Sequence, residues 1–149
     1  MSDLLGPMRR RPVLAGLGTL LAGTLAGCSE SRDPVTVETS IHLSDGDRRQ
    51  TMVDGERDDL DAGQYVWWEF TTNSRLEATY DVRVTAGETV NVYVLTVAER
   101  EVFEDEESGF DAVEGSIQTE TEGVERTITL DAGEYSLVVA NADILPENA

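Results

Sequence analysis

Apolar and polar residues alternate in short runs along most of this chain, and this pattern limits its fold more than any other feature. A period of two residues puts every second side chain on one face of a strand, which is typical of half-buried β-strands. Most segments between the runs contain the glycine, asparagine or aspartate that a chain reversal favours. The alternating runs are residues 35–43, 65–71, 76–85, 89–97, 124–130 and 134–141. Strands this short and closely spaced predict an all-β domain over residues 35–149, an antiparallel β-sandwich of jelly-roll-like form.

One segment departs from the alternation. Residues 98–105 read Ala-Glu-Arg-Glu-Val-Phe-Glu-Asp, so good helix formers surround a single apolar pair. We expect a short surface helix, inserted between two strands and ending near Ser108 and Gly109.

A six-residue sequence occurs twice, as Leu-Asp-Ala-Gly-Gln-Tyr at 60–65 and as Leu-Asp-Ala-Gly-Glu-Tyr at 130–135. In each copy the glycine suits a turn that needs a positive φ, and the tyrosine begins a strand. Two copies are too few for a repeat array, so we interpret them as equivalent hairpins in two packed sheets.

The N-terminal region has the layout of a signal peptide. Arginine occupies positions 9, 10 and 11, and the uncharged run 12–27 that follows is rich in Leu, Ala and Gly. As a helix rising 1.5 Å per residue, this run would reach only about 24 Å, whereas a hydrocarbon core is roughly 30 Å thick. We therefore predict a removable signal peptide over residues 1–27 rather than a permanent membrane span.

Arg10 and Arg11 stand directly before Pro12 and an apolar stretch, an arrangement that resembles the twin-arginine export signal. The resemblance implies that the protein crosses the membrane already folded. Residues 1–7 add nothing that such a signal needs, so a true start at Met8 is an alternative.

Cys28 is the only cysteine of the chain, and the residues Leu25-Ala26-Gly27-Cys28 resemble a lipobox. The resemblance implies that Cys28 receives a lipid, that the chain is cut just before it, and that the mature protein is anchored at the outer face of the cytoplasmic membrane. A lone cysteine cannot form an internal disulfide, which agrees with this use. Residues 28–34 would then be the lipidated cysteine and a short polar tether.

The chain carries 30 acidic residues against 11 basic ones, and every basic residue is arginine. Residues 28–149 alone hold 29 acidic and 8 basic residues, a net charge of −21. Binding of nucleic acid needs a clustered cationic surface, so nucleic acid is excluded as a partner. The lysine-free composition resembles that of proteins from extreme halophiles, in which molar salt screens the repulsion between carboxylates.

The sequence offers little for catalysis or metal binding. His42 is the only histidine, and lipidation of Cys28 would leave no thiol, so nucleophilic catalysis and zinc or iron sites lack their usual residues. Acidic clusters at 58–61 and 104–107 supply oxygen atoms, but neither has the spaced loop of a dedicated calcium site. We predict a protein that is not an enzyme and holds no metal or cofactor.

Residues 65–70 read Tyr-Val-Trp-Trp-Glu-Phe and form the most aromatic run of the chain. On a strand Val66, Trp68 and Phe70 share the more apolar face, which predicts that they point into the core. Tyr65 and Trp67 would then lie on the opposite face.

The two six-residue copies predict the reverse, because they make Tyr65 equivalent to Tyr135, which begins the inward-facing set of its own strand. On either argument we expect only one of Trp67 and Trp68 to be fully buried. Tyr65 and Trp67 are our candidate contacts for a carbohydrate or a partner protein, because exposed aromatic rings offer large apolar contact areas.

Residues 92–96, the expected helix, Gly115-Ser116 and residues 127–141 together resemble the small β-sandwich modules related to pre-peptidase C-terminal and Golgi-dynamics-type domains. The resemblance covers about residues 60–143 and consists of turn glycines and strand alternation. It implies a β-sandwich with a non-catalytic accessory role, and it carries over no site residues. With its arginine pair and its acidity, the whole chain resembles a haloarchaeal lipoprotein exported by the twin-arginine route.

We therefore expect a non-enzymatic surface lipoprotein, held to the membrane by the lipid on Cys28, whose β-sandwich binds an envelope protein or a carbohydrate or acts as an accessory module. The alternative is a lipoprotein that captures a solute or a metal ion for a transport system. A capture protein needs a concave site of roughly 300 Å³ or more with converging polar groups. An interaction module instead presents a flat patch or an open strand edge.

Overall fold

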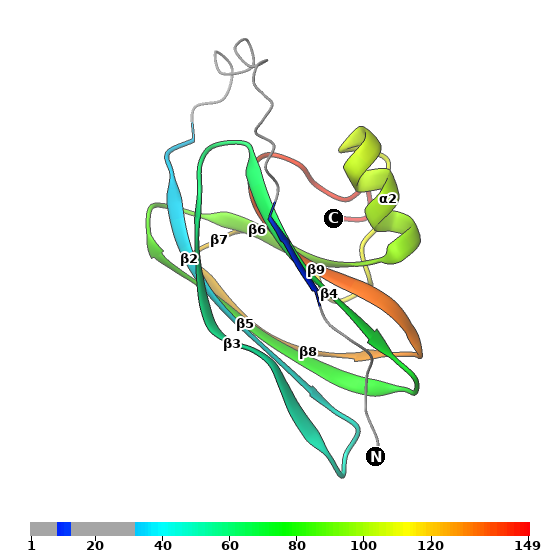
Figure 1. Ribbon diagram of the computed structural model, residues 1–149. Coiled ribbons are helices and arrows are strands. Elements are labelled where there is room, and N and C mark those ends of the chain that lie inside the picture. The colour runs from blue at the N-terminus through cyan, green and yellow to red at the C-terminus, as the bar shows by residue number, and fades with distance from the viewer. Residues whose placement is uncertain (1–8, 13–31) are drawn as a thin grey trace.

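Two antiparallel sheets pack face to face in the computed structural model, which describes residues 9–12 and 32–149 (Figure 1). The helix-side sheet has the order β1 (Arg9–Pro12), β4 (Gln64–Thr72), β9 (Gly133–Asn141), β6 (Val90–Thr96) and β7 (Gln118–Thr121). The open sheet has the order β3 (Arg49–Leu60), β2 (Val35–Ser44), β5 (Leu76–Ala86) and β8 (Gly123–Leu130). The predicted antiparallel β-sandwich is confirmed, and strands β2 to β9 divide four and four between the sheets, as in a double-sheet jelly roll.

The main core lies between the two sheets and is built by alternation along each strand. On β2 every second residue is buried, beginning at Val35, and the residues between them are half-buried. Val66, Trp68 and Phe70 enter the same core from β4. The prediction from their apolar character, that these three side chains point inward, is therefore confirmed. Burying an apolar side chain of this size stabilises a fold by about 1.5–3 kcal/mol, and the main core contains 21 buried residues.

The six expected strands match β2, β4, β5, β6, β8 and β9 to within one residue at each end. The inserted helix is also confirmed, as α2 (Val97–Glu106). Its N-cap is Thr96, whose hydroxyl accepts a hydrogen bond from the Glu99 amide at 3.3 Å. It ends before the expected residues, at Glu107, which takes the left-handed conformation (φ 56°) and donates its amide to the Phe103 carbonyl at 2.9 Å.

The alternation does not reveal β3 or β7. Val53 and Leu60 are the buried apolar residues of β3, because β3 is the outer strand of the open sheet and its other positions are mostly charged or polar. Gly55 has a φ of 66°, and the register against β2 shifts around Ile41, so a β-bulge interrupts the strand. β7 has only four residues.

Our interpretation of the two six-residue copies as equivalent hairpins is wrong. Both turns cross from the open sheet to the helix-side sheet, one between β3 and β4 and the other between β8 and β9. They lie at opposite ends of the sandwich, because Gln64 pairs with Asn141 and Thr72 pairs with Gly133. Gly63 has a positive φ of 84°, whereas Gly133 does not. The tyrosines that follow lie on different faces, Tyr65 on the outer face of the helix-side sheet and Tyr135 in the main core.

In the described parts of the chain no helix has the length and apolar character needed to cross a membrane. Arg10 and Arg11 lie in β1. Cys28 and residues 1–8 and 13–27 of the predicted signal peptide lie outside the described residues, so the lipid attachment stays a prediction.

Candidate functional site

Both tryptophans are buried, which corrects the expectation that one of them lies outside. Trp68 is in the main core, and Trp67 is 3% exposed on the opposite face of β4. Tyr65, beside it on that face, is 7% exposed. The reason is that the helix-side sheet is covered on its outer face as well, so neither Tyr65 nor Trp67 is presented to a ligand as an open ring surface.

The cover of the helix-side sheet is built on an aromatic cluster, whose buried members are Tyr65, Trp67, Tyr93, Leu95, Phe103, Phe110, Ala112, Val138 and Ala140. Phe103 is the one buried residue of α2 and lies at the centre of the cluster. Its ring meets those of Tyr65 and Phe110 edge to face, with centroids 4.6 and 5.2 Å apart. Aromatic pairs in this geometry add about 0.5–1.5 kcal/mol each beyond the burial of their area.

Two further contacts hold the cover in place. Arg100 of α2 binds Glu69 of β4 through Nη1 and Oε2 at 2.6 Å, and its guanidinium lies 5.2 Å from the centre of the Trp67 ring. At the C-terminal end, the Tyr93 hydroxyl donates to the Ile144 carbonyl at 2.8 Å, and Asn148 exchanges two hydrogen bonds with the backbone of Ala112. The aromatic face is therefore a second core.

Burial makes the four tyrosines of the chain resist ionisation. It raises the pKa of Tyr65 and of Tyr80 to about 12, and it raises the pKa of Tyr93 and of Tyr135 as well. The carboxylates of Glu107 and Glu104 add to the effect on the pKa of Tyr65. Because the folded pKa values lie above the ordinary value of 10.0, the folded state holds these protons more tightly than the unfolded state.

We expect this stabilisation to be complete below pH 10 and to be lost as the pH rises to about 12. Tyrosinate absorbance measured against pH, with circular dichroism on the same samples, should show ionisation and unfolding in one joint transition. Ionisation of most tyrosines near pH 10 in a chain that keeps its β-sheet signal would contradict the burial described above.

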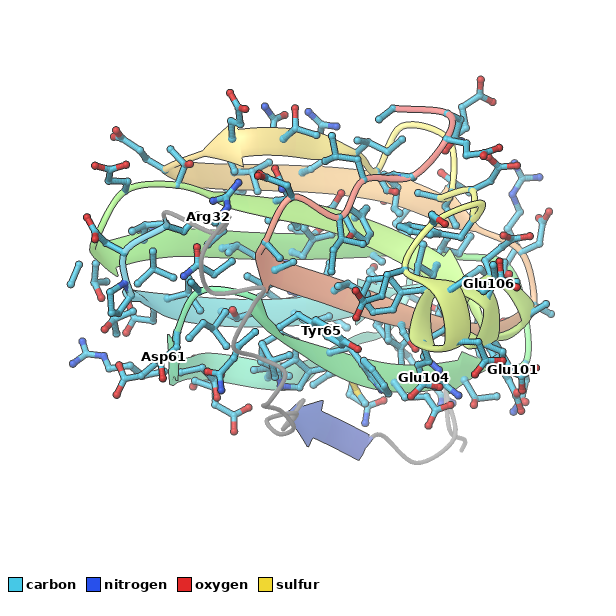
Figure 2. All side chains as sticks on the ribbon, turned by 90° about the horizontal axis from the view of Figure 1, so that it is seen from above. Arg32, Asp61, Tyr65, Glu101, Glu104 and Glu106 are labelled. Carbon is cyan, nitrogen blue, oxygen red and sulfur yellow. The ribbon has the colours of Figure 1, made fainter. Side chains whose placement is uncertain are left out.

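The chain enters the sandwich through a clamp at one end, which we call the tether end. Arg32 bonds Asp143 at 2.5 Å, and its Nη1 donates to Asn141 Oδ1 at 3.4 Å and to the Thr89 carbonyl at 3.5 Å (Figure 2). The Asn141 side chain in turn donates to the carbonyl of Asp33 at 3.0 Å. The segment before β2 is thus tied to the C-terminal end of β9 and to the residue before β6. Arg32, which makes most of these contacts, is four positions after Cys28 in the sequence.

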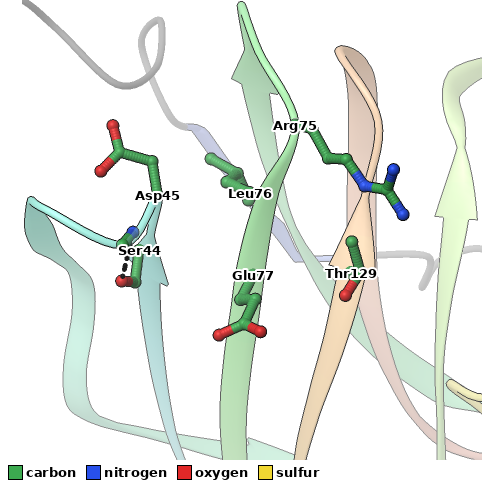
Figure 3. Close-up of a pocket in the computed structure, with 7 residues that line it drawn as sticks. Ser44, Asp45, Arg75, Leu76, Glu77 and Thr129 are labelled. Atoms are coloured by element: carbon green, nitrogen blue, oxygen red, sulfur yellow. Dashed lines mark hydrogen bonds between the residues drawn. The ribbon is translucent and has the colours of Figure 1, made fainter.

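The opposite end, which we call the far end, carries a surface hollow. Its volume is about 380 Å³, and it is lined by Ser44, Asp45, Gly46, Arg75, Leu76, Glu77 and Thr129 (Figure 3). These residues come from the end of β2 and the turn after it, from the start of β5 and the residue before it, and from β8.

The charged groups of this hollow do not converge. Asp45 accepts hydrogen bonds from the backbone amides of Arg48 and Asp47 at 2.9 and 3.0 Å, which lowers the pKa of its carboxyl group and fixes the turn. Arg75 extends toward Asp131, 3.8 Å away, and in Figure 3 it points away from Asp45. The hollow reaches the volume of a capture site, but it lacks the common focus of polar groups that orients a small ligand.

Among the residues considered for catalysis or metal binding, His42 and the acidic cluster at 58–61 lie on the strands of the open sheet or in the turn after β3. His42 lies on the outer face of the open sheet, with its Nδ1 3.0 Å from the Thr51 hydroxyl. In the 58–61 cluster, Asp58 is 7% exposed and Asp59 accepts a hydrogen bond from Thr36 at 2.7 Å. Among residues 9–12 and 32–149, no group of three or more His, Cys, Asp and Glu side chains is placed to hold a metal ion.

The structure therefore offers three surfaces on which a partner could act: the tether end, the far end with its hollow, and the outer edges of the two sheets. The sequence predicts none of these surfaces as a partner site: Arg32 enters only as part of the tether 28–34, and the predicted contacts Tyr65 and Trp67 are buried. Likeness to a β-sandwich module family stays an expectation of the sequence. Comparison of the chain with protein-family models, with curated proteins and with solved structures finds no match.

Proposed function

We propose that this chain is a surface lipoprotein, anchored to the outer face of the cytoplasmic membrane by a lipid on Cys28, whose β-sandwich serves as a binding or accessory module of the cell envelope. The observation that carries the proposal is the Arg32 clamp at the tether end. A lipidated Cys28 would be four residues from Arg32, a distance of at most about 14 Å for an extended chain. Such an anchor would hold the tether end beside the membrane and turn the far end outward.

The position of the two ends supports a module rather than a capture protein. The turns at the far end are polar and surround a hollow whose charged groups diverge, as Figure 3 shows for Asp45 and Arg75. The outer edge of β4, which is paired with β1 in the full chain, can pair with another strand once residues 1–27 are removed. Export through the route that Arg10 and Arg11 resemble would deliver the sandwich in its folded form.

The anchor is tested by Cys28→Ser in the full chain, expressed in cells that process lipoproteins and fed a labelled fatty acid. We expect Cys28→Ser to abolish acyl labelling and to leave the protein either as precursor or in the medium. Ser31→Ala is the matched control, because it changes the same tether by one small residue and should keep the label. Acyl labelling of the Cys28→Ser chain at the level of the control would contradict the proposal.

A further inference from the structure

We propose that the outer edge of β4 is a strand-acceptor site for an extended, arginine-rich segment. In the full chain the segment is Arg9–Pro12, and once the signal peptide is removed the same edge is open to a basic segment of a partner protein. The second step rests on the proposed function, because it requires removal of residues 1–27.

The first observation is the pairing itself. β1 runs antiparallel to β4 along its outer edge, with Arg9 opposite Glu69, Arg10 opposite Trp68, Arg11 opposite Trp67 and Pro12 opposite Val66 (Figure 1). β4 is bonded on its other side to β9, so it becomes the last strand of the helix-side sheet when β1 is absent. An added strand satisfies backbone groups that an edge leaves open, and this is how β-strand addition gives affinity.

The second observation is that β4 lacks the features by which other edges discourage pairing. β3 carries several charged residues and the bulge at Gly55, β8 carries the oppositely charged Glu125 and Arg126, and β7 has only four residues. β4 is nine residues long, has Glu69 as its one charged residue and contains no proline or glycine. A long apolar edge of this kind pairs readily with another strand.

The third observation is the charge around the edge. Glu69 lies in β4, and Glu56 of β3 accepts a hydrogen bond from Trp68 Nε1 at 2.9 Å, so its carboxylate lies beside β4. Glu104 and Glu107, at the end of α2, are close enough to raise the pKa of Tyr65, and Figure 2 shows Glu104 on this side of the molecule. Arg100 pairs with Glu69 and lies 3.9 Å from Glu104, so four carboxylates stand against one guanidinium near this edge. The remaining negative charge, in a chain of net charge −19, favours a strand rich in arginine.

The pairing in the full chain is tested by a disulfide. In a Cys28→Ser chain, Arg9→Cys with Glu69→Cys places two thiols on directly opposed residues, whose Cβ atoms are typically about 5 Å apart. The control is Arg9→Cys with Thr71→Cys, which moves one thiol two positions along β4. We expect the opposed pair to form its disulfide about tenfold faster than the control under mild oxidation, as measured by intact mass after thiol blocking. Equal rates, or no disulfide in the opposed pair, would overturn the proposed pairing.

Acceptance of a strand from another molecule is tested with a fluorescent peptide that has the sequence of residues 7–13. The open form is the full chain with Arg10→Pro and Arg11→Pro, whose own segment has lost the amides that it needs for pairing. The closed form is the oxidised Arg9→Cys, Glu69→Cys chain. We expect the peptide to bind the open form and to bind the closed form at least about tenfold more weakly, because the closed form has no vacant edge.

A second peptide, with serine in place of its three arginines, measures the contribution of charge. We expect this peptide to bind the open form about tenfold more weakly, because it lacks the charge complementarity between the arginines and the acidic edge. Equal binding to the open and closed forms would place the contact elsewhere, and no binding to the open form would overturn the acceptor site. Neither of these peptide-binding results would change the acyl labelling of Cys28. A wrong acceptor site can therefore be distinguished from a wrong lipid anchor.

Discussion

Replacing Phe103 by alanine should destabilise the protein by about 3–5 kcal/mol, since a fully buried ring would be lost from the centre of the aromatic cluster. In a domain of this size, that loss lowers the melting temperature by about 10 °C or more. Trp67 should become more exposed because α2 loses its one buried side chain, and tryptophan fluorescence should shift to longer wavelength.

Glu101→Ala is the matched control, because Glu101 is exposed on the same helix and alanine preserves helix propensity. Its effect should stay within about 0.5 kcal/mol. Thermal melts followed by circular dichroism and by fluorescence compare the two variants. If Phe103→Ala cost no more than Glu101→Ala, α2 would not be an integral part of the sandwich and Trp67 would have to be covered by something else.

The second large effect concerns salt. With a net charge of −21 on residues 28–149, neighbouring carboxylates lie within one Debye length of each other in 0.01 M salt, where that length is roughly 30 Å. At 1 M the length is about 3 Å, and most of these repulsions are screened. Native stability is typically only about 5–15 kcal/mol, so many weak repulsions are a large fraction of it. We expect the Cys28→Ser chain to melt on the order of 10 °C lower in 0.01 M than in 2 M potassium chloride.

Two controls separate screening from ion binding. Asp105→Asn with Glu106→Gln removes two exposed charges from α2 and should reduce the salt dependence, because fewer repulsions remain to be screened. Millimolar calcium in low salt should not replace molar salt. A melting temperature that does not change with salt would contradict the halophile interpretation, and a rise specific to calcium would favour the ion-capture alternative.

The strands that alternate and the helix between them could be predicted because each pattern has a local cause. Val35, Val37 and the next alternate residues of β2 are buried and their neighbours are not, so the period is visible in the sequence. β3 could not be found in this way, since an outer strand has few buried positions and the charges of residues 54–59 resemble those of a loop. A strand of this kind is defined by its partner, β2, rather than by its own residues.

Whether Trp67 is buried could not be predicted from the sequence of β4 alone. Alternation allows two buried faces only when something covers the second face, and here the cover comes from α2 and from the segment around Ile144, which are distant in the sequence. The continuous apolar runs of residues 92–95 and 137–140 contained a usable signal, because strands buried on both faces lose their alternation. The pairing of Arg9–Pro12 with β4 had no such signal, since a signal peptide is not expected to form a strand.

The position of β9 sets the order in which this protein can be assembled during its synthesis. Among the described strands β9 is synthesised after all the others, and it lies between β4 and β6, which do not pair with each other. The helix-side sheet therefore cannot close until residues 133–141 have emerged, and the Ile144 and Asn148 contacts that secure α2 form later still. Folding of this sandwich thus waits for residues 133–148, and a growing chain that lacks them cannot hold this tertiary structure.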